Sequence, residues 1–172
     1  MSDYTRSHAD ISPCGTYRYL LEREWSDFNV DQDGSAMFVM LNPSTADGDV
    51  DDPTIRRCVG FAKAWGYGWL SVVNLFAYRA TDPAELSKAG EAIHGPRNQE
   101  VIEDAAKRAG IIVCAWGAHK AADWQAEVVR GWLHDRKLYA LGFTKSGHPR
   151  HPLYLPNNAV PVEFFHEERN RP

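Results

Sequence analysis

The chain contains the segment Phe38–Val39–Met40–Leu41–Asn42–Pro43–Ser44, an apolar run that stops at an amide, a proline and a hydroxyl. Two later segments follow the same design: Leu70–Ser71–Val72–Val73–Asn74–Leu75 and Ile111–Ile112–Val113–Cys114–Ala115–Trp116–Gly117. Buried strands that end abruptly at polar or turn-forming residues are typical of parallel sheets, which present functional groups at their carboxyl edge. The three segments therefore predict a parallel-sheet protein with a site at that edge.

Amphipathic segments alternate with these apolar runs. The hydrophobic spacing predicts helices over residues 54–65, 98–108 and 118–133, with Asp52 as the cap of the first. Further strands are expected over residues 15–24 and 137–141. The alternation predicts an α/β fold, a three-layer α/β/α sandwich with a central, mostly parallel four-stranded sheet. One domain spanning residues 1–172, with its core at about 36–155, accounts for the length.

The composition excludes several classes of protein. A net charge of −4 argues against a chain that coats nucleic acid by bulk attraction, although a small enzyme with a local basic rim fits it. No apolar run approaches the roughly 20 residues that span a membrane, and the N-terminus lacks a secretion signal. Three scattered cysteines (Cys14, Cys58 and Cys114) suit reduced thiols, and zinc-ligand spacing is lacking. We expect a cytoplasmic monomer without metal, cofactor or membrane contact.

Polar residues that follow the strands are the candidates for chemistry, and each has a structural alternative. Asn42 either holds a water or a substrate edge where the sheet opens, or it breaks the chain in a turn with Pro43. Asn74 either presents a donor and an acceptor to a planar amide-like ring, or it satisfies local backbone groups. The aspartates after the first segment suit a solvated, helix-capping loop better than a magnesium site. They are Asp47, Asp49, Asp51 and Asp52.

Two further features offer polar groups. Trp116–Gly117 precedes the expected third helix. In one interpretation the N-terminus of this helix binds an anion at the sheet edge, and in the other the tryptophan only packs beneath the site. A Gly- and Pro-bearing loop carries His148, His151, Lys145 and Arg150, which suits a phosphate-gripping loop or a solvated turn. The chain has no Gly-x-Ser-x-Gly, Walker-type or Gly-x-Gly-x-x-Gly motif, so serine-hydrolase and nucleotide-fold interpretations lose their main support.

The segments, taken in order, resemble the motifs of the uracil-DNA glycosylase superfamily. Its members carry Gly-Gln-Asp-Pro-Tyr-His or Gly-Ile-Asn-Pro-Gly, then strands ending in Asn and in Trp-Gly, then a loop of the form His-Pro-Ser-Pro-Leu. The corresponding residues here are Leu41–Ser44, Val72–Asn74, Ala115–Ala118 and His148–Leu153. The resemblance runs from about residue 36 to 155 and suggests a divergent bacterial and phage branch. The first Gly is replaced, and the last loop is one residue longer, so both its histidines are candidates.

The resemblance implies a DNA glycosylase, a hydrolase that breaks the N-glycosidic bond of a flipped-out base and leaves an abasic site. Asn42 would position the water, His151 or His148 would hydrogen-bond the departing base, and Asn74 would bind its edge. The implied substrate-binding residues further include Leu41, Pro43, Ser44, Asp47, Phe76, Trp116 and Gly117. The implied DNA-binding residues are Lys145, Ser146, Arg150, Leu153 and Tyr154.

One position bears on the substrate. Uracil-specific members have a tyrosine after the Asp-Pro pair that blocks groups at the pyrimidine 5-position, and Ser44 stands there in this chain. The resemblance therefore implies a 5-substituted pyrimidine, such as hydroxymethylated or glucosylated cytosine in phage DNA, and a role in phage defence. Two alternatives stay open: a non-catalytic module that senses modified bases or nucleotides, and an enzyme that acts on free nucleosides or nucleotides.

Overall fold

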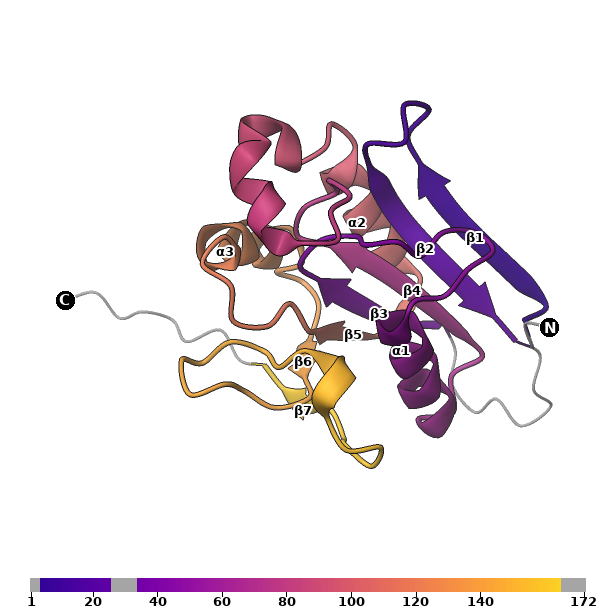
Figure 1. Ribbon diagram of the computed structural model, residues 1–172. Coiled ribbons are helices and arrows are strands. Elements are labelled where there is room, and N and C mark those ends of the chain that lie inside the picture. The colour runs from indigo at the N-terminus through magenta and orange to yellow at the C-terminus, as the bar shows by residue number, and fades with distance from the viewer. Residues whose placement is uncertain (1–3, 26–33, 165–172) are drawn as a thin grey trace.

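A seven-stranded sheet forms the centre of the described part of the chain (Figure 1). The computed structural model describes residues 4–25 and 34–164. The strand order is β1-β2-β4-β3-β5-β6-β7. The strands are β1 (Arg6–Ile11), β2 (Arg18–Glu24), β3 (Ser35–Met40), β4 (Trp69–Asn74), β5 (Ala109–Cys114), β6 (Leu138–Ala140) and β7 (Val162–Glu163).

The middle of the sheet is parallel and its two sides are antiparallel. β4, β3, β5 and β6 pair in parallel, with Phe38 of β3 opposite Val72 and Val113. β1 and β2 on one side and β7 on the other pair antiparallel with their neighbours. The predicted α/β class is confirmed, but the sheet has seven strands instead of four and is mixed. The sequence did not reveal β1 and β7 because neither carries the apolar run or alternation of a buried strand.

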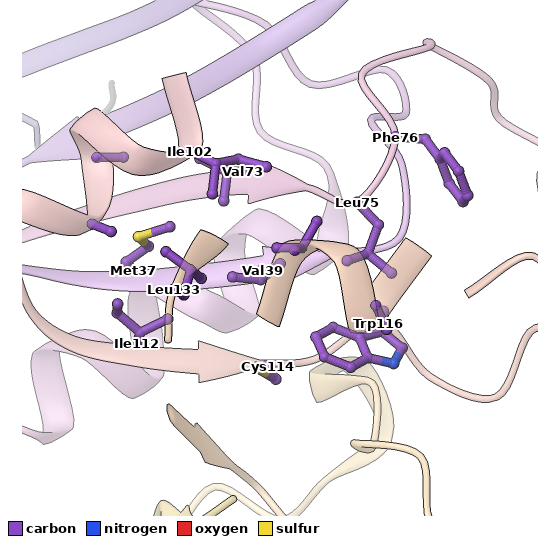
Figure 2. Close-up of a cluster of buried hydrophobic side chains, with 14 of the residues drawn as sticks. Met37, Val39, Val73, Leu75, Phe76, Ile102, Ile112, Cys114, Trp116 and Leu133 are labelled. Carbon is purple, nitrogen blue, oxygen red and sulfur yellow. The ribbon is translucent and has the colours of Figure 1, made fainter. Parts of the chain in front are cut away.

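Side chains of β3 alternate between two cores. Phe38 and Met40 join the core beneath α1 (Pro53–Ala64), whereas Met37 and Val39 join the core beneath α2 (Asn98–Lys107) and α3 (Ala122–Trp132). Figure 2 shows the second core, in which Met37, Val39 and Ile112 lie close to Leu133. Burial on both faces explains why β3 reads as a continuous apolar run.

The residues at which the helices begin can be explained from the hydrogen bonds and backbone conformation at their N-termini. Asp52 caps α1 as predicted, since its Oδ1 accepts a hydrogen bond from the Ile55 N–H at 2.9 Å, and Pro53 occupies the first turn. α3 begins at Ala122 rather than at residue 118, and residues 118–121 form a loop and a turn in which the Ala121 N–H donates to Nδ1 of His119. The predicted helix N-terminus beside Trp116–Gly117 is therefore wrong. Short 3₁₀ helices cover Pro83–Lys88, Gly90–Ile93 and Pro152–Tyr154.

The connections between the parallel strands open a crevice. From β3 the chain runs through α1 to β4 on one side, and it then returns through α2 to β5 on the other side of β3 (Figure 1). Where two adjacent parallel strands have connections that leave in opposite directions, their carboxyl ends flank a ligand-binding crevice. Within residues 4–25 and 34–164, no helix combines the length and apolar character needed to cross a bilayer.

Candidate functional site

A cavity of about 590 Å³ lies at this carboxyl edge. Its wall combines residues that follow β3, β4 and β5 with the N-terminus of α1 and the loop around His151. Pockets for small molecules occupy about 300–1,000 Å³, so the cavity has the size of a ligand site. It brings together these predicted residues: Leu41, Asn42, Ser44, Asn74, Trp116, Gly117, His151 and Leu153.

Asn74 ends β4, and its side-chain amide has no hydrogen-bond partner among the residues that the structure describes. The residue is 1% exposed and lines the cavity, and neither Nδ2 nor Oδ1 is hydrogen-bonded to any described residue. Its backbone is held firmly, because Asn98 of α2 donates from Nδ2 to the Asn74 carbonyl at 3.0 Å. A buried polar group left unpaired costs about 1–3 kcal/mol. The Asn74 side chain therefore carries an unpaired donor and an unpaired acceptor at the edge of the cavity.

Asn42 follows β3 and ties two loops together. Its Nδ2 donates to the carbonyl of Ala80 at 2.8 Å and to that of Pro43 at 3.1 Å, while the Ala80 N–H donates to the Pro43 carbonyl at 2.9 Å. These bonds occupy the amide nitrogen and fix the plane of the side chain. The Asn42 Oδ1 is thereby left as the acceptor that this side chain can offer to the cavity. A neutral amide is not a strong base, so Asn42 can orient a water but not deprotonate it.

His151 contributes a hydrogen-bond donor. Its Nδ1 accepts from the Leu153 N–H at 3.3 Å, so the neutral ring carries its proton on Nε2. Burial lowers the pKa of His151, and the nearby Asp52 carboxylate only partly opposes this shift. The ordinary pKa is about 6.5, so the imidazole is mainly neutral at pH 7. The Gly117 N–H donates to the Pro149 carbonyl at 2.9 Å and holds the histidine loop against the end of β5.

The other candidate histidine lies elsewhere. His148 is not part of the cavity wall, and its Nε2 lies 3.4 Å from Oδ1 of Asp123 in α3. Of the two loop histidines, the structure brings only His151 to the cavity. Pro43 and Phe76 are also outside the wall, because Pro43 is buried in the loop and Phe76 belongs to the second core (Figure 2).

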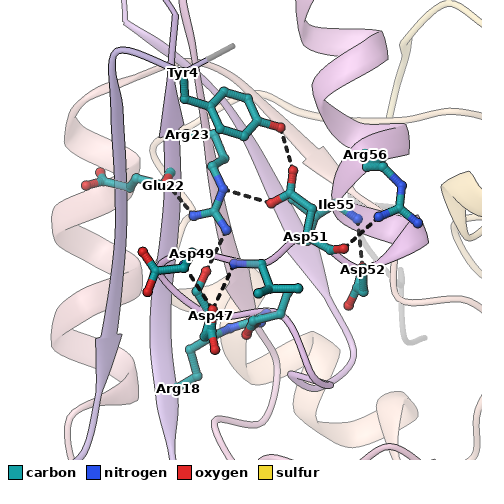
Figure 3. Close-up of polar contacts among 12 residues, drawn as sticks. Tyr4, Arg18, Glu22, Arg23, Asp47, Asp49, Asp51, Asp52, Ile55 and Arg56 are labelled. Atoms are coloured by element: carbon teal, nitrogen blue, oxygen red, sulfur yellow. Dashed lines mark hydrogen bonds and ion pairs between the residues drawn. The ribbon is translucent and has the colours of Figure 1, made fainter. Parts of the chain in front are cut away.

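The aspartates after β3 organise their own loop, as Figure 3 shows. Asp47 Oδ1 accepts from the Asp49 N–H at 2.9 Å, so the carboxylate predicted to bind substrate instead closes a turn. Arg23 donates from Nε to Asp51 Oδ1 at 2.8 Å, and the Tyr4 hydroxyl donates to Asp51 Oδ2. Helix capping thus fits Asp52 and an exposed loop fits Asp49, whereas the Asp51 carboxylate is largely buried in its ion pair with Arg23. Among the described residues, no group of three or more His, Cys, Asp or Glu is placed to hold a metal ion.

The predicted DNA-contacting residues lie mainly on the surface. Lys145, Ser146 and Arg150 are exposed on the loop that leads to His151. Leu153 lines the cavity, and the neighbouring Tyr154 is 84% exposed. Of these residues only Leu153 is part of the wall, and Tyr154 follows it in sequence, whereas Lys145 and Ser146 lie at the tip of a turn closed by the pairing of Phe143 with Pro149.

Three ionisable residues of the wall were not predicted as site residues, namely Arg18, Asp52 and His119, and neither were the threonines Thr45, Thr54 and Thr81. Arg18 is the first residue of β2. Because β2 runs antiparallel to β4, the amino end of β2 lies at the same edge of the sheet as the carboxyl end of β4. An arginine at the start of an apolar strand was the available signal. Asp52 was identified only as a helix cap, and the late start of α3 leaves His119 in the loop that borders the cavity.

These features define an α/β protein with a ligand-sized cavity at the carboxyl edge of its parallel strands. The chain belongs to the family described as "Protein of unknown function (DUF1643)", whose profile matches residues 18–153. The matched region runs from Arg18 to Leu153 and so contains every residue of the cavity wall. No curated protein and no solved structure matches the chain.

Proposed function

We propose that the chain is a monofunctional DNA glycosylase, which hydrolyses the N-glycosidic bond of a pyrimidine flipped out of DNA and leaves an abasic site. The observation that carries the proposal is the unpaired Asn74 amide at a cavity wall that also holds Asn42 and His151. An amide with a free donor and acceptor complements the edge of a pyrimidine, which presents an acceptor and a donor side by side. The resemblance of the four segments to uracil-DNA glycosylases supports the same function and a glycosylase-like α/β/α sandwich.

The chemistry requires a leaving base that carries the bond electrons away. As the bond breaks, negative charge builds on the base and positive charge on the sugar; a water then adds its oxygen to the sugar, and the proton that it loses is taken up by the departing base anion. The Nε2–H of His151 would hydrogen-bond the charged oxygen of the base, which is worth most in a water-excluded site. The Asn42 Oδ1 would accept a hydrogen bond from the water and orient it. A dissociative path of this kind needs no strong base.

The cavity favours a substituted pyrimidine. Ser44 lies in the wall, and in the resemblance it stands where uracil-specific enzymes carry the tyrosine that blocks the 5-position; about 590 Å³ is also more space than a bare pyrimidine fills. We therefore propose hydroxymethylated or glucosylated cytosine in phage DNA as the substrate and phage defence as the role. Lys145 and Arg150 would contact phosphates beside the flipped nucleotide, and Tyr154 would occupy the gap left in the base stack.

Base release from defined duplexes tests this function. The protein is incubated with duplexes that contain uracil, 5-hydroxymethylcytosine or its glucoside, and abasic sites are then cleaved with alkali. We expect strand cleavage at a substituted cytosine. Cleavage at plain uracil alone would refute the open pocket. Binding of DNA without base release would favour a non-catalytic module, and nucleoside hydrolysis with weak, salt-independent DNA binding would favour an enzyme of free nucleosides.

A variant of Asn42 separates catalysis from binding. Asn42→Ala should lower the rate of base release on the order of 10²-fold, the scale of removing one preorganised polar group from a transition state. Its DNA affinity should stay roughly intact, because phosphate contacts supply most of that affinity. Asn158→Ala, which changes an exposed asparagine, is the matched control and should behave as the wild type. An equal loss of affinity and rate in Asn42→Ala would contradict the assigned role.

A further inference from the structure

A β-bulge aims Arg18 at the cavity. The pairing of β1 with β2 steps from Asp10 opposite Leu20 to Ile11 opposite Arg18, so β2 contains Tyr19 as an extra residue. As a result Tyr19 and Leu20 both enter the core beneath α2 and α3, and Arg18 turns to the opposite face, where it lines the cavity. Bulges recur next to functional sites because they redirect a side chain in this way.

The guanidinium of Arg18 is incompletely satisfied. The residue is 2% exposed; its Nη1 donates to the Ala46 carbonyl at 2.7 Å, but its Nε has no hydrogen-bond partner in the described part of the chain. Burial lowers the pKa of Arg18 to about 10, and the Asp52 carboxylate partly opposes the shift, so the group stays charged at neutral pH. A buried cationic donor that lacks a partner is expensive, and a bound ligand would remove that cost.

The neighbours of Arg18 define which ligand fits. Arg18 only donates hydrogen bonds, whereas the Asp52 carboxylate in the same wall only accepts them. The hydroxyls of Ser44, Thr45 and Thr54 also line the cavity. Hydroxyl groups both donate and accept, so they suit a donor and an acceptor placed together. A phosphate would be attracted by Arg18 but repelled by Asp52, which disfavours an anion.

We infer that Arg18 and Asp52 form a second subsite of the cavity, which binds a hydroxyl-bearing substituent of the base, namely a hydroxymethyl group or a sugar attached to it. The inference rests on the proposed function, because it seats the pyrimidine edge on Asn74. Arg18 is then a specificity-determining residue: it selects the substituted base and takes no part in breaking the glycosidic bond.

Calorimetric binding of free nucleosides tests the subsite without relying on catalysis. The ligands are 2′-deoxycytidine, its 5-hydroxymethyl derivative, the glucoside of that derivative, and inorganic phosphate. Wild-type protein should bind the glucoside about tenfold more tightly than deoxycytidine, the scale of one charge-assisted hydrogen bond. Arg18→Met should abolish this preference and leave the affinity for deoxycytidine within about twofold. Arg79→Met removes a nearby positive charge that is outside the wall and should keep the preference.

A second variant distinguishes a loss of ligand preference from a loss of folding. Arg18→Lys keeps the charge but not the planar fork of donors, so it should fold and still lose most of the preference. Equal binding of all three nucleosides by the wild type, or an unchanged preference in both Arg18 variants, would overturn the subsite. Tighter binding of phosphate than of the glucoside would assign Arg18 to anions and would also overturn it. An Arg18-dependent preference in a protein that releases no base from DNA would refute the proposed function and leave the subsite standing.

Discussion

Replacing Asn74 with leucine should stabilise the protein and abolish ligand binding. Asn74 and leucine have similar size, and the substitution removes an amide whose two polar atoms are buried and unpaired. Each such atom costs about 1–3 kcal/mol, and part of that gain is lost because leucine has a different shape. We expect the free energy of unfolding to rise by about 2 kcal/mol, which corresponds to a rise in Tm of about 4–8 °C for a chain of this size.

The same substitution at Asn98 should have the opposite effect. Asn98 is equally buried, but its Nδ2 donates to the carbonyls of Asn74 at 3.0 Å and Leu75 at 3.2 Å. Leu75 keeps a bond from Gln125 Nε2, whereas Asn74 would lose the bond that Asn98 supplies to its carbonyl. The Asn98 Oδ1 is itself unpaired among the described residues, so its removal offsets part of this loss, and Asn98→Leu should lower the free energy of unfolding by about 1 kcal/mol. Asn98 begins α2 and its side chain contacts the carboxyl end of β4, so the two changes place leucine in the same buried region and differ in the hydrogen bonds that they remove.

Urea and thermal denaturation followed by circular dichroism measure both effects. Calorimetry with the nucleosides then tests binding, which Asn74→Leu should abolish. Destabilisation by Asn74→Leu of the size expected for Asn98→Leu would show that the Asn74 amide is satisfied within the protein. The amide would then not be reserved for a ligand, and the argument for base recognition would fail.

Three other predictions concern groups around the site and on the surface. Burial lowers the pKa of His151, so the folded protein binds a proton at this imidazole less tightly than the unfolded chain does. The free energy of unfolding should therefore fall as the pH drops below about 6.5, and it should fall less steeply in His151→Gln. Denaturant titrations at several pH values that give the same pH dependence for both proteins would contradict this. Hydrogen bonds, the largest from Ser12, lower the pKa of exposed Cys14 to about 7, while burial raises the pKa of the other two cysteines. A thiol reagent should therefore modify one cysteine quickly, with a half-maximal rate near pH 7, and the others only after unfolding. Arg23→Met leaves the Asp51 carboxylate without its ion-pair partner and should lower the free energy of unfolding, measured by urea denaturation, by about 3 kcal/mol. A change below experimental error would refute the role of Arg23 in holding the loop.

The sequence contained most of what places the cavity. The ends of β3, β4 and β5 were predicted to within about two residues, because strands buried on both faces leave long apolar runs and stop at polar residues. Asp52 and Pro53 marked the start of α1 through ordinary capping chemistry. Asn42, Asn74 and His151 then meet because carboxyl ends of parallel strands share one edge.

Other features depended on tertiary contacts that periodicity does not encode. Arg18 reaches the cavity only through the bulge at Tyr19, and a single extra residue in a strand leaves no distinct pattern in one sequence. His148 and His151 were equivalent candidates until the structure placed one beside Asp123 and the other in the wall. The late start of α3 accompanies a turn at His119, which accepts from the N–H groups of Ala121 and Ala122, and an amphipathic pattern cannot show such a turn.

The outer strands limit what the sheet can attach to. β1 exposes Arg6, Ser7 and His8 along one margin, and β7 at the other margin is two residues long and follows Pro161. Charged side chains, proline and short length are the means by which natural proteins prevent a free strand from templating aggregation. In the described part of the chain, both margins of the sheet thus carry features that disfavour pairing with a further strand, while the ligand site at the strand ends stays open.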